Sequence, residues 1–249
     1  MREKLLLPSI TIPYGDGLNV PYYLDSASIL AALSLRLPED QNTHMILDAC
    51  AAPGCKTLVL ASRMEKKTEL IANEYSSERR RRLAAVLDKH LPSELRDRVR
   101  VSGFDAAAAA GRHSERNRFA AVLLDVPCSS EHHVIQNKTE LEKWTPARPR
   151  FLVRRQWSLL SAAFLLLENG GSLVYATCSL NPEENDGVAE RLLKKYGDVH
   201  QAGMEACCIL DKPDFPEGEE TEFGRIILPD TAEDSGPLYV ARFRKQKDL

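Results

Sequence analysis

Five short apolar runs, each followed by a polar residue, constrain the fold of this chain more than any other feature. The runs are continuous rather than alternating, which is typical of strands buried on both faces of a parallel sheet. Four of them lead to an acidic residue and the fifth leads to a threonine. In chain order, with that polar residue in parentheses, they are 45–47 (Asp48), 69–72 (Glu74), 99–101 (Asp105), 121–124 (Asp125) and 173–176 (Thr177).

Helical patterns fill the segments between these runs. The expected helices are Ser26–Leu37, Ser77–His90 with Ser76 as its cap, Phe151–Leu167, and one that starts at Asn181-Pro182-Glu183-Glu184. Two further strands are expected over Arg225–Leu228 and Leu238–Phe243. This series predicts an α/β fold, with a doubly wound, mostly parallel, seven-stranded sheet and helices on both faces. We expect residues 43–249 to form this domain and residues 1–42 to form an extension with one helix packed on it.

Composition excludes several classes of protein. With 249 residues and a net charge of -3, the chain is not a uniformly basic, histone-like binder, although a local basic stripe is compatible with nucleic acid. It has no apolar run long enough to cross a membrane, and Pro8 interrupts the apolar patch near its start, so no secretory signal is expected. The cysteines form no Cys-x-x-Cys pair, which predicts reduced thiols in the cytoplasm, or in mitochondria if a presequence has been removed. They are Cys50, Cys55, Cys128, Cys178, Cys207 and Cys208.

Ligands of such a sheet bind outside the carboxyl ends of its strands. The small residues between Asp48 and Thr57 let the backbone approach a ligand closely. Neither the phosphate-loop spacing nor the dinucleotide Gly-x-Gly-x-x-Gly pattern is present, so a nucleoside ligand without phosphate fits better. Glu74 stands where a ribose diol is held in such folds, or it is an acid at a helix start. Asp105 is placed to accept from an adenine amino group, or it forms a turn.

Two cysteines follow the fourth and fifth runs, whose strands are neighbours in this topology. We therefore expect Cys128 and Cys178 to flank one cleft, as a nucleophile and an acid or base. A lone cysteine is more often a small buried hydrophobic residue, and two neighbouring thiols also form disulfides. A zinc site that includes His132 and His133 is disfavoured because the spacing is unspecific, so no metal is expected.

One stretch combines cations with aromatic side chains and contains no acid. Cations for phosphates and aromatics for stacking are typical of contact with single-stranded RNA. The alternative is a solvated helix face with Phe151 and Trp157 in the core. The candidate RNA-binding residues are Lys143, Trp144, Arg148, Arg150, Arg154 and Arg155.

Three motifs resemble those of the Sun-type (Nsun/Fmu) RNA cytosine-5 methyltransferases, which have the Rossmann-like fold of class I S-adenosylmethionine-dependent enzymes. They are Asp48-Ala-Cys-Ala-Ala-Pro-Gly-Cys-Lys-Thr57, Asp125-Val-Pro-Cys-Ser129 and Tyr175-Ala-Thr-Cys-Ser-Leu-Asn-Pro-Glu-Glu-Asn185. The resemblance extends from about Tyr22 to Lys245. The segments that open and close it are most similar to the compact mitochondrial branch of that family.

The resemblance implies S-adenosylmethionine as cofactor and RNA as substrate, with ribosomal RNA favoured over tRNA. Cys178 would attack carbon 6 of cytosine, and Cys128 would assist proton removal and release of the enzyme. Asp125 would bind the base and Lys56 would support the site. The residues implied to bind the cofactor are Cys50, Ala51, Ala52, Pro53, Gly54, Cys55, Lys56, Glu74, Arg79, Asp105 and Asp125.

Some positions depart from the family pattern. Cys55 replaces the usual second glycine of Gly-Gly-Lys, and its side chain would crowd the cofactor if the position needs a positive φ. We expect no added RNA-binding domain beyond the catalytic domain, and we therefore expect a partner protein or a preformed RNA surface to direct substrate choice. A noncatalytic ribosome-assembly factor is the main alternative. A methyltransferase for proteins or small molecules ranks last, because it has no obvious use for two thiols.

Overall fold

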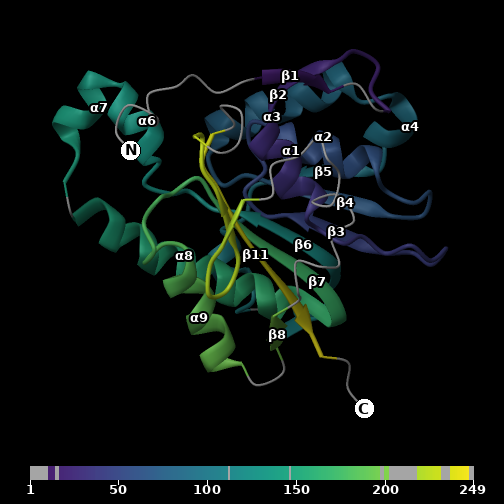
Figure 1. Cartoon of the computed structure of the whole chain (residues 1–249). Helices are drawn as coiled ribbons and strands as arrows, with labels where there is room; N and C mark the ends of the chain where they lie inside the picture. The colour runs from purple at the N-terminus through teal and green to yellow at the C-terminus, as the bar shows by residue number, and fades with distance from the viewer. Residues whose placement is uncertain are drawn as a thin grey trace.

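The computed structural model describes residues 11–14, 17–111, 113–145, 147–196, 199–201, 218–230 and 236–246. A nine-stranded sheet forms its centre, and eight of these strands follow one another in the order β5-β4-β3-β6-β7-β11-β10-β9 (Figure 1). The ninth, β8, pairs with β11, so the expected count of seven is wrong. The strands are β3 Met45–Asp48, β4 Glu69–Asn73, β5 Val99–Ser102, β6 Phe119–Asp125, β7 Leu167–Thr177, β8 Val199–Gln201, β9 Glu219–Glu220, β10 Arg225–Ile227 and β11 Leu238–Lys245.

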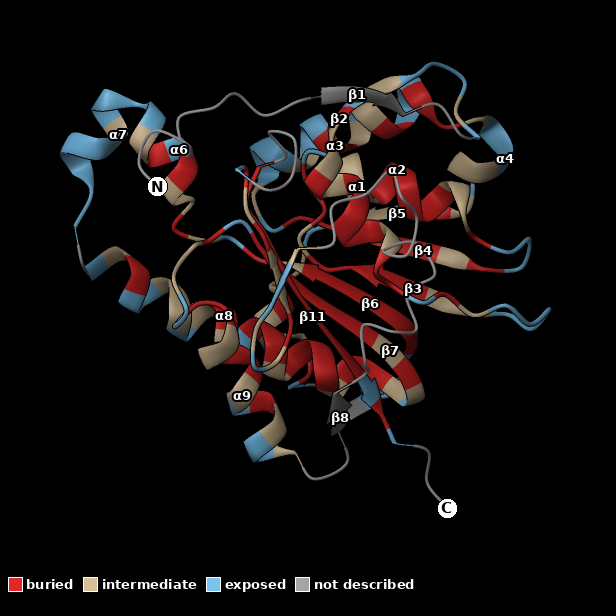
Figure 2. Cartoon of the chain, viewed as in Figure 1, coloured by how far each residue is buried: buried red, intermediate tan, exposed pale blue. Residues whose placement is uncertain are grey.

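The five strands predicted from continuous apolar runs are parallel to one another. The pairs β3–β4, β3–β6, β4–β5 and β6–β7 are all parallel, whereas β11 runs antiparallel to β7. Burial of the sheet on both faces explains the apolar runs, because all but the last residue of β6 is buried (Figure 2). Asp125 lies opposite Ala176 in the ladder, so the segments that follow β6 and β7 leave the sheet side by side.

Helices cover both faces of this sheet. One apolar cluster joins α1, α2 and α3 to one face, and a second joins α5, α8 and α9 to the other. The short helices α6 and α7 extend away from the sheet; α7 is mostly exposed, whereas α6 buries His132 and Val134 (Figures 1 and 2). The helices are α1 Ser26–Leu33, α2 Cys55–Ser62, α3 Ser77–His90, α4 Ser93–Arg96, α5 Ala106–Ala109, α6 Glu131–Gln136, α7 Lys138–Lys143, α8 Ala147–Leu166 and α9 Asp186–Lys195.

The predicted helix bounds differ in accuracy. Helix α3 has the bounds expected from its sequence, because the Ser76 side chain accepts a hydrogen bond from the Arg79 amide and caps it. The first helix ends at Leu33 rather than Leu37. The helix expected to start at Asn181 begins instead at Asp186, because residues 182–185 form a turn.

The residues before β3 form a two-stranded antiparallel sheet and one helix. The strands β1 Thr11–Tyr14 and β2 Tyr22–Asp25 pair with each other, and Asp25 then caps α1. Helix α1 packs on α2, and the Arg63 guanidinium donates to the carbonyl oxygens of Ala32 and Leu35. Among the described residues, no helix is both long and apolar enough to cross a membrane. The described part of the chain does not include Cys207, Cys208 or the first ten residues. The expectation of reduced thiols rests partly on these two cysteines, and the expectation of no secretory signal rests on the first ten residues.

Candidate active site

The loop between β3 and α2 forms the centre of the strand-end surface. Gly54 has a φ of 120°, and a Cβ there would lie 3.1 Å from Val86 Cγ1 of α3, so this position requires glycine. Cys55 is the first residue of α2, and the only described residues other than glycine with positive φ are Asn117 and Ser130. The concern that Cys55 needs a positive φ is therefore wrong, since Gly54 supplies the unusual backbone.

Burial governs the ionisable groups of this loop. Asp48 is fully buried; its Oδ2 accepts a hydrogen bond from Thr57 Oγ1 at 2.7 Å, while its Oδ1 has no hydrogen-bond partner among the described residues. This burial raises the pKa of Asp48 to about 7. Burial likewise raises the pKa values of the Cys50 and Cys55 thiols, so neither is prepared to act as a nucleophile. Between these groups Ala51, Ala52 and Gly54 are buried, and Pro53 is exposed.

Lys56 and Asp125 join α2 to the end of β6. Lys56 Nζ lies 2.7 Å from Asp125 Oδ2 and 3.3 Å from Ser28 Oγ of α1. Burial opposes the charge on Lys56, but the Asp125 carboxylate outweighs this effect and raises the pKa of Lys56 above its usual value. The site thus contains a fixed ammonium and a partly exposed carboxylate, which can both contact a polar ligand.

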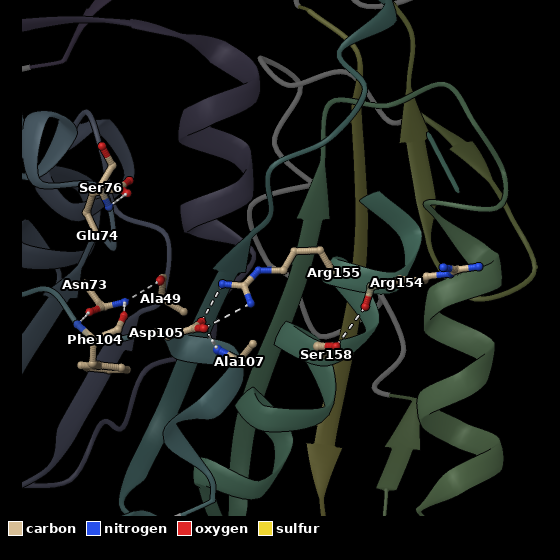
Figure 3. A network of polar contacts seen from close by, with 10 residues as sticks. All are labelled: Ala49, Asn73, Glu74, Ser76, Phe104, Asp105, Ala107, Arg154, Arg155 and Ser158. Carbon is tan, nitrogen blue, oxygen red and sulfur yellow. Dashed lines mark hydrogen bonds and ion pairs between the residues drawn. The ribbon is translucent and has the colours of Figure 1, made fainter. Parts of the chain in front are cut away.

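Glu74 lies at the end of β4, and its side chain is held in place on both oxygens. It is 5% exposed; Oε1 accepts from the Ser76 amide at 2.8 Å, and Oε2 lies 3.1 Å from Arg79 Nη1. Arg79 also donates to the carbonyl oxygen of Ala52 at 2.9 Å, so it points back toward the loop, as the sequence predicts. The sequence gives no sign of the role of Asn73, whose side chain bonds to the backbone of Ala49 and Phe104 and so ties together three strand ends (Figure 3).

Asp105 and Arg155 form an ion pair that no sequence pattern predicts. Arg155 Nη2 lies 2.6 Å from Asp105 Oδ1, which also accepts from the Ala107 amide and caps α5 (Figure 3). The hydrogen bond from Arg155 lowers the pKa of Asp105. The expectation that Arg155 is an RNA-binding cation finds no support in this geometry, because its guanidinium already pairs with Asp105. Asp105 is a helix cap, and Arg155 occupies the carboxylate that was expected to face adenine.

The two predicted thiols meet at the ends of β6 and β7. Cys128 Sγ and Cys178 Sγ are 2.7 Å apart, and both cysteines are free thiols. Cys178 is exposed and Cys128 is half-buried, so the pair is not sealed inside the apolar core. The hydrogen bond between the thiols lowers the pKa of Cys178 and raises that of Cys128. Cys178 is therefore the better nucleophile of the two.

A buried polar network beneath the thiols holds their two loops together. Glu184 is fully buried and accepts hydrogen bonds from the Ser129 amide at 3.0 Å and from Gln156 Nε2 at 2.7 Å. Ser129 Oγ lies 2.9 Å from Ser179 Oγ, and Glu131 accepts from the Leu180 amide. The sequence predicts Glu184 only as a helix-start acid and does not predict this network. The sequence does contain a sign of this network, because Ser129 follows Cys128 and Ser179 follows Cys178.

The predicted RNA-binding stretch is divided among several roles. Lys143 and Arg148 lie 3.8 and 3.7 Å from the two carboxylate oxygens of Glu140, and Arg155 pairs with Asp105. Arg150 and Arg154 are exposed, and within the described part of the chain neither has a carboxylate in ion-pair range. Figure 3 shows Arg154 and Arg155 leaving α8 in opposite directions.

The aromatic side chains of this stretch also differ. Phe151 is 70% exposed and Trp144 is 37% exposed, so Phe151 does not lie in the core. Trp157 packs against the core, with Arg191 and Lys195 over its ring. No group of three metal-ligating side chains occurs in the described part of the chain, and His132 instead contacts Gln136 Nε2 at 2.9 Å.

Comparison with known proteins identifies the family. Residues 34–244 match the family model described as 16S rRNA methyltransferase RsmB/F. The chain belongs to the RsmB/F family. Among its curated relatives, the ribosomal RNA small subunit methyltransferase F of Aeromonas salmonicida is 34% identical over 96% of this chain and 49% of its own length. That of Vibrio parahaemolyticus is 36% identical over 92% of this chain and 46% of its own length. The chain thus spans about half the length of these RsmB/F relatives.

Solved structures agree with this assignment. The structure of NSun6 from Pyrococcus horikoshii with SFG has a TM-score of 0.72 and 26% identity, and the match covers 94% of this chain and 55% of that one. A methyltransferase homologue from the same organism has a TM-score of 0.68 at 24% identity, over 93% of this chain and 69% of that one, and supports the fold alone. The expected class I methyltransferase fold and the Sun-type resemblance are both confirmed, and the RsmB/F match includes the three motifs quoted above.

Proposed function

We propose that this chain transfers a methyl group from S-adenosylmethionine to carbon 5 of cytosine in ribosomal RNA. The thiol pair carries the proposal, because two free sulfurs 2.7 Å apart share one exposed opening. Carbon 5 of cytosine is a poor nucleophile, and temporary addition of a thiolate at carbon 6 divides one difficult step into two easier ones. Methylation of a nitrogen or oxygen, which already carries a lone pair, needs no such pair of thiols.

The residues around the β3–α2 loop fit the cofactor. Gly54 keeps the loop free of a side chain, and the fixed Glu74 carboxylate presents oxygens to a ribose diol. Asp48 Oδ1 is a buried acceptor that finds no donor in the described part of the chain, which suits a ligand that brings a donor or a positive charge. The cofactor supplies an electrophilic methyl group when bound. Residues 50–56, Glu74, Arg79 and Asp125 are proposed to hold it, and Asp105 would join them by giving up its ion pair with Arg155.

The chain's own residues divide the chemistry as follows. The Cys178 thiolate forms a bond to carbon 6 of cytosine, and the ring electrons displaced by this addition make carbon 5 nucleophilic. Asp125, held by Lys56, hydrogen-bonds the base and fixes its orientation. After methylation, Cys128, once its thiol has released its own proton to solvent, accepts the proton of carbon 5, and the bond between Cys178 and carbon 6 breaks, which restores the aromatic ring and returns Cys178 as a thiolate.

Ribosomal RNA is proposed as the substrate because the curated relatives are named for it. Arg150, Arg154 and the exposed Phe151 provide cations and a stacking surface along α8. Phosphate contacts of this kind position RNA without reading its sequence. We therefore propose that RNA shape or a partner protein supplies the choice of nucleotide. The reduced thiols suit a reducing compartment such as the cytoplasm.

A ribosome-assembly factor without activity remains the alternative function. The experiment that separates the two incubates the purified chain with ribosomal RNA and S-adenosylmethionine and sequences the 5-methylcytosine formed. We expect methylation at a defined cytosine by the native chain and none by Cys178→Ala. Cofactor binding in calorimetry without methylation of any ribosomal RNA would contradict the proposed substrate. Absence of both binding and methylation would favour the assembly factor.

A further inference from the structure

Ser130 has an unusual backbone beside the thiol pair. Its φ and ψ are 53° and 51°, in the left-handed region that glycine adopts freely and an L side chain does not. It follows the Cys128 loop directly and precedes α6, where its side chain makes no cap hydrogen bond. The serine side chain is thus kept at a backbone position where glycine would be more favourable.

The hydroxyl of Ser130 lies against both sulfurs. Ser130 Oγ is 3.2 Å from Cys178 Sγ, 3.4 Å from Cys128 Sγ and 3.4 Å from the carbonyl oxygen of Cys128. A hydroxyl has one proton to donate. Of these three contacts, the one to Cys178 is the shortest, and it leads to the exposed sulfur.

From this geometry we infer that Ser130 is a positioning residue that donates its hydroxyl hydrogen to the Cys178 thiolate and holds it ready for attack. The inference rests on the proposed function, in which Cys178 is the nucleophile. The thiolate then receives two hydrogen bonds, one from the Cys128 thiol and one from Ser130. The left-handed backbone of Ser130 is what brings its short side chain within reach of both sulfurs.

The groups around Cys178 act on its pKa in a way that agrees with this role of Ser130. The hydrogen bonds from Cys128 and Ser130 both lower the pKa of Cys178, and the Lys56 ammonium lowers it further. Burial and the Asp125 carboxylate act in the opposite direction. Because hydrogen bonds to a charged form favour that form, removal of the Ser130 hydroxyl is expected to return the pKa of Cys178 toward its ordinary value.

The test is the pH dependence of iodoacetamide alkylation of the full chain, with the modified cysteine identified by mass spectrometry and neither RNA nor cofactor present. Ser130→Ala removes the hydroxyl and keeps the side-chain carbon, whereas Ser130→Gly removes the hydroxyl and also relieves the backbone. We expect both variants to shift the inflection for Cys178 upward by about half a unit to one unit. At low pH this corresponds to about 3- to 10-fold less thiolate.

The control is Ser158→Ala, which removes a hydroxyl that bonds within α8 to the Arg154 carbonyl oxygen and should leave the inflection of Cys178 unmoved. No shift in either variant, or a shift in only one of them, would overturn the inference, because the hydroxyl is absent from both. This test separates failure of the Ser130 role from failure of the proposed function, because alkylation needs no substrate. If the native chain methylates RNA and the Ser130 variants show no shift, only the role of Ser130 is contradicted.

Discussion

Glu184 shows how one buried carboxylate supports a reactive pair that it does not touch. It accepts from the backbone of Ser129, next to Cys128, and from Gln156 of α8, and the Tyr175 hydroxyl donates to its carbonyl oxygen at 2.6 Å. Loss of the carboxylate removes the acceptor of the Ser129 amide and one of the two acceptors of Gln156 Nε2 in a buried place, whereas the Tyr175 hydroxyl keeps its bond to the backbone carbonyl. Glu184 therefore links the stability of the domain to the position of Cys128.

Glu184→Ala is expected to lower the free energy of unfolding by about 3 kcal/mol, the cost of leaving buried donors unsatisfied. Urea denaturation of both proteins measures this difference. The neighbouring Glu183 is exposed, so Glu183→Ala is the matched control and should change stability by less than about 0.5 kcal/mol. Equal effects of the two substitutions would show that the buried network does not stabilise the loop.

Asp48 is the residue whose titration should appear in the stability of the protein. Burial raises its pKa to about 7 from an ordinary value of 3.8. The unfolded chain releases this proton near pH 4 and the folded protein releases it near pH 7. Stability from this group is therefore complete below pH 4 and decreases as the pH rises to about 7.

Asp48→Asn removes this titration and is expected to flatten the dependence of unfolding free energy on pH between 5 and 8. At pH 8 the variant should be the more stable protein, by at most about 4 kcal/mol for a shift of this size. Urea titrations at several pH values provide the measurement, with the exposed Asp97→Asn as control. An unchanged slope in Asp48→Asn would mean that another group produces the pH dependence.

At the scale of elements, the β3–α2 connection depends on the backbone of Gly54. Gly54→Ala places a Cβ at a φ of 120° and 3.1 Å from Val86 Cγ1. We expect a loss of about 1–3 kcal/mol in unfolding free energy, together with weaker binding of S-adenosylmethionine in calorimetry.

Gly187 is the matched control for this substitution. It lies in α9 without a positive φ, and the nearest atom to an added Cβ is the Pro182 carbonyl oxygen at 3.4 Å. Because alanine favours a helix, Gly187→Ala should be neutral or stabilising by up to about 1 kcal/mol. Gly54→Ala with native stability and native cofactor binding would contradict the role given to this turn.

Helix α8 presents arginines of different function on different sides. Arg154→Ala is expected to weaken RNA binding and to reduce the slope of log affinity against log salt by about 0.7, the value for one phosphate contact on a single strand. Arg155→Ala should leave this slope unchanged, since Asp105 already neutralises that guanidinium. Fluorescence anisotropy over a range of salt concentrations compares the two. An equal reduction in both variants would restore Arg155 as an RNA contact.

Elements with local signals are those that the sequence predicts well. Helix α3 has its Ser76 cap, and the five parallel strands have continuous apolar runs, so local sequence locates them. The start of α9 fails for a tertiary reason. Glu184 has the composition of a helix-start acid, but it is drawn into a buried network with Ser129 and Gln156, and the helix begins two residues later.

At the scale of the whole molecule, topology brings together what the sequence separates. Cys128 and Cys178 are 50 residues apart, and the parallel pairing of β6 with β7 places their sulfurs in contact. This meeting could be predicted, because it follows from strand order alone. The Asp105–Arg155 ion pair and the hydroxyl of Ser130 could not, because each depends on side-chain directions that no periodicity encodes.

The central claim is that Cys178 is the nucleophile and that Cys128 acts in release of the product. Trapping of a covalent adduct with RNA tests this claim most directly. The native chain, Cys128→Ala and Cys178→Ala are incubated with ribosomal RNA and S-adenosylmethionine, then separated on a denaturing gel. Cys128→Ala should accumulate a protein–RNA adduct because release fails, whereas Cys178→Ala should form neither adduct nor 5-methylcytosine. An adduct in Cys178→Ala, or equal partial methylation by both variants, would contradict the assignment.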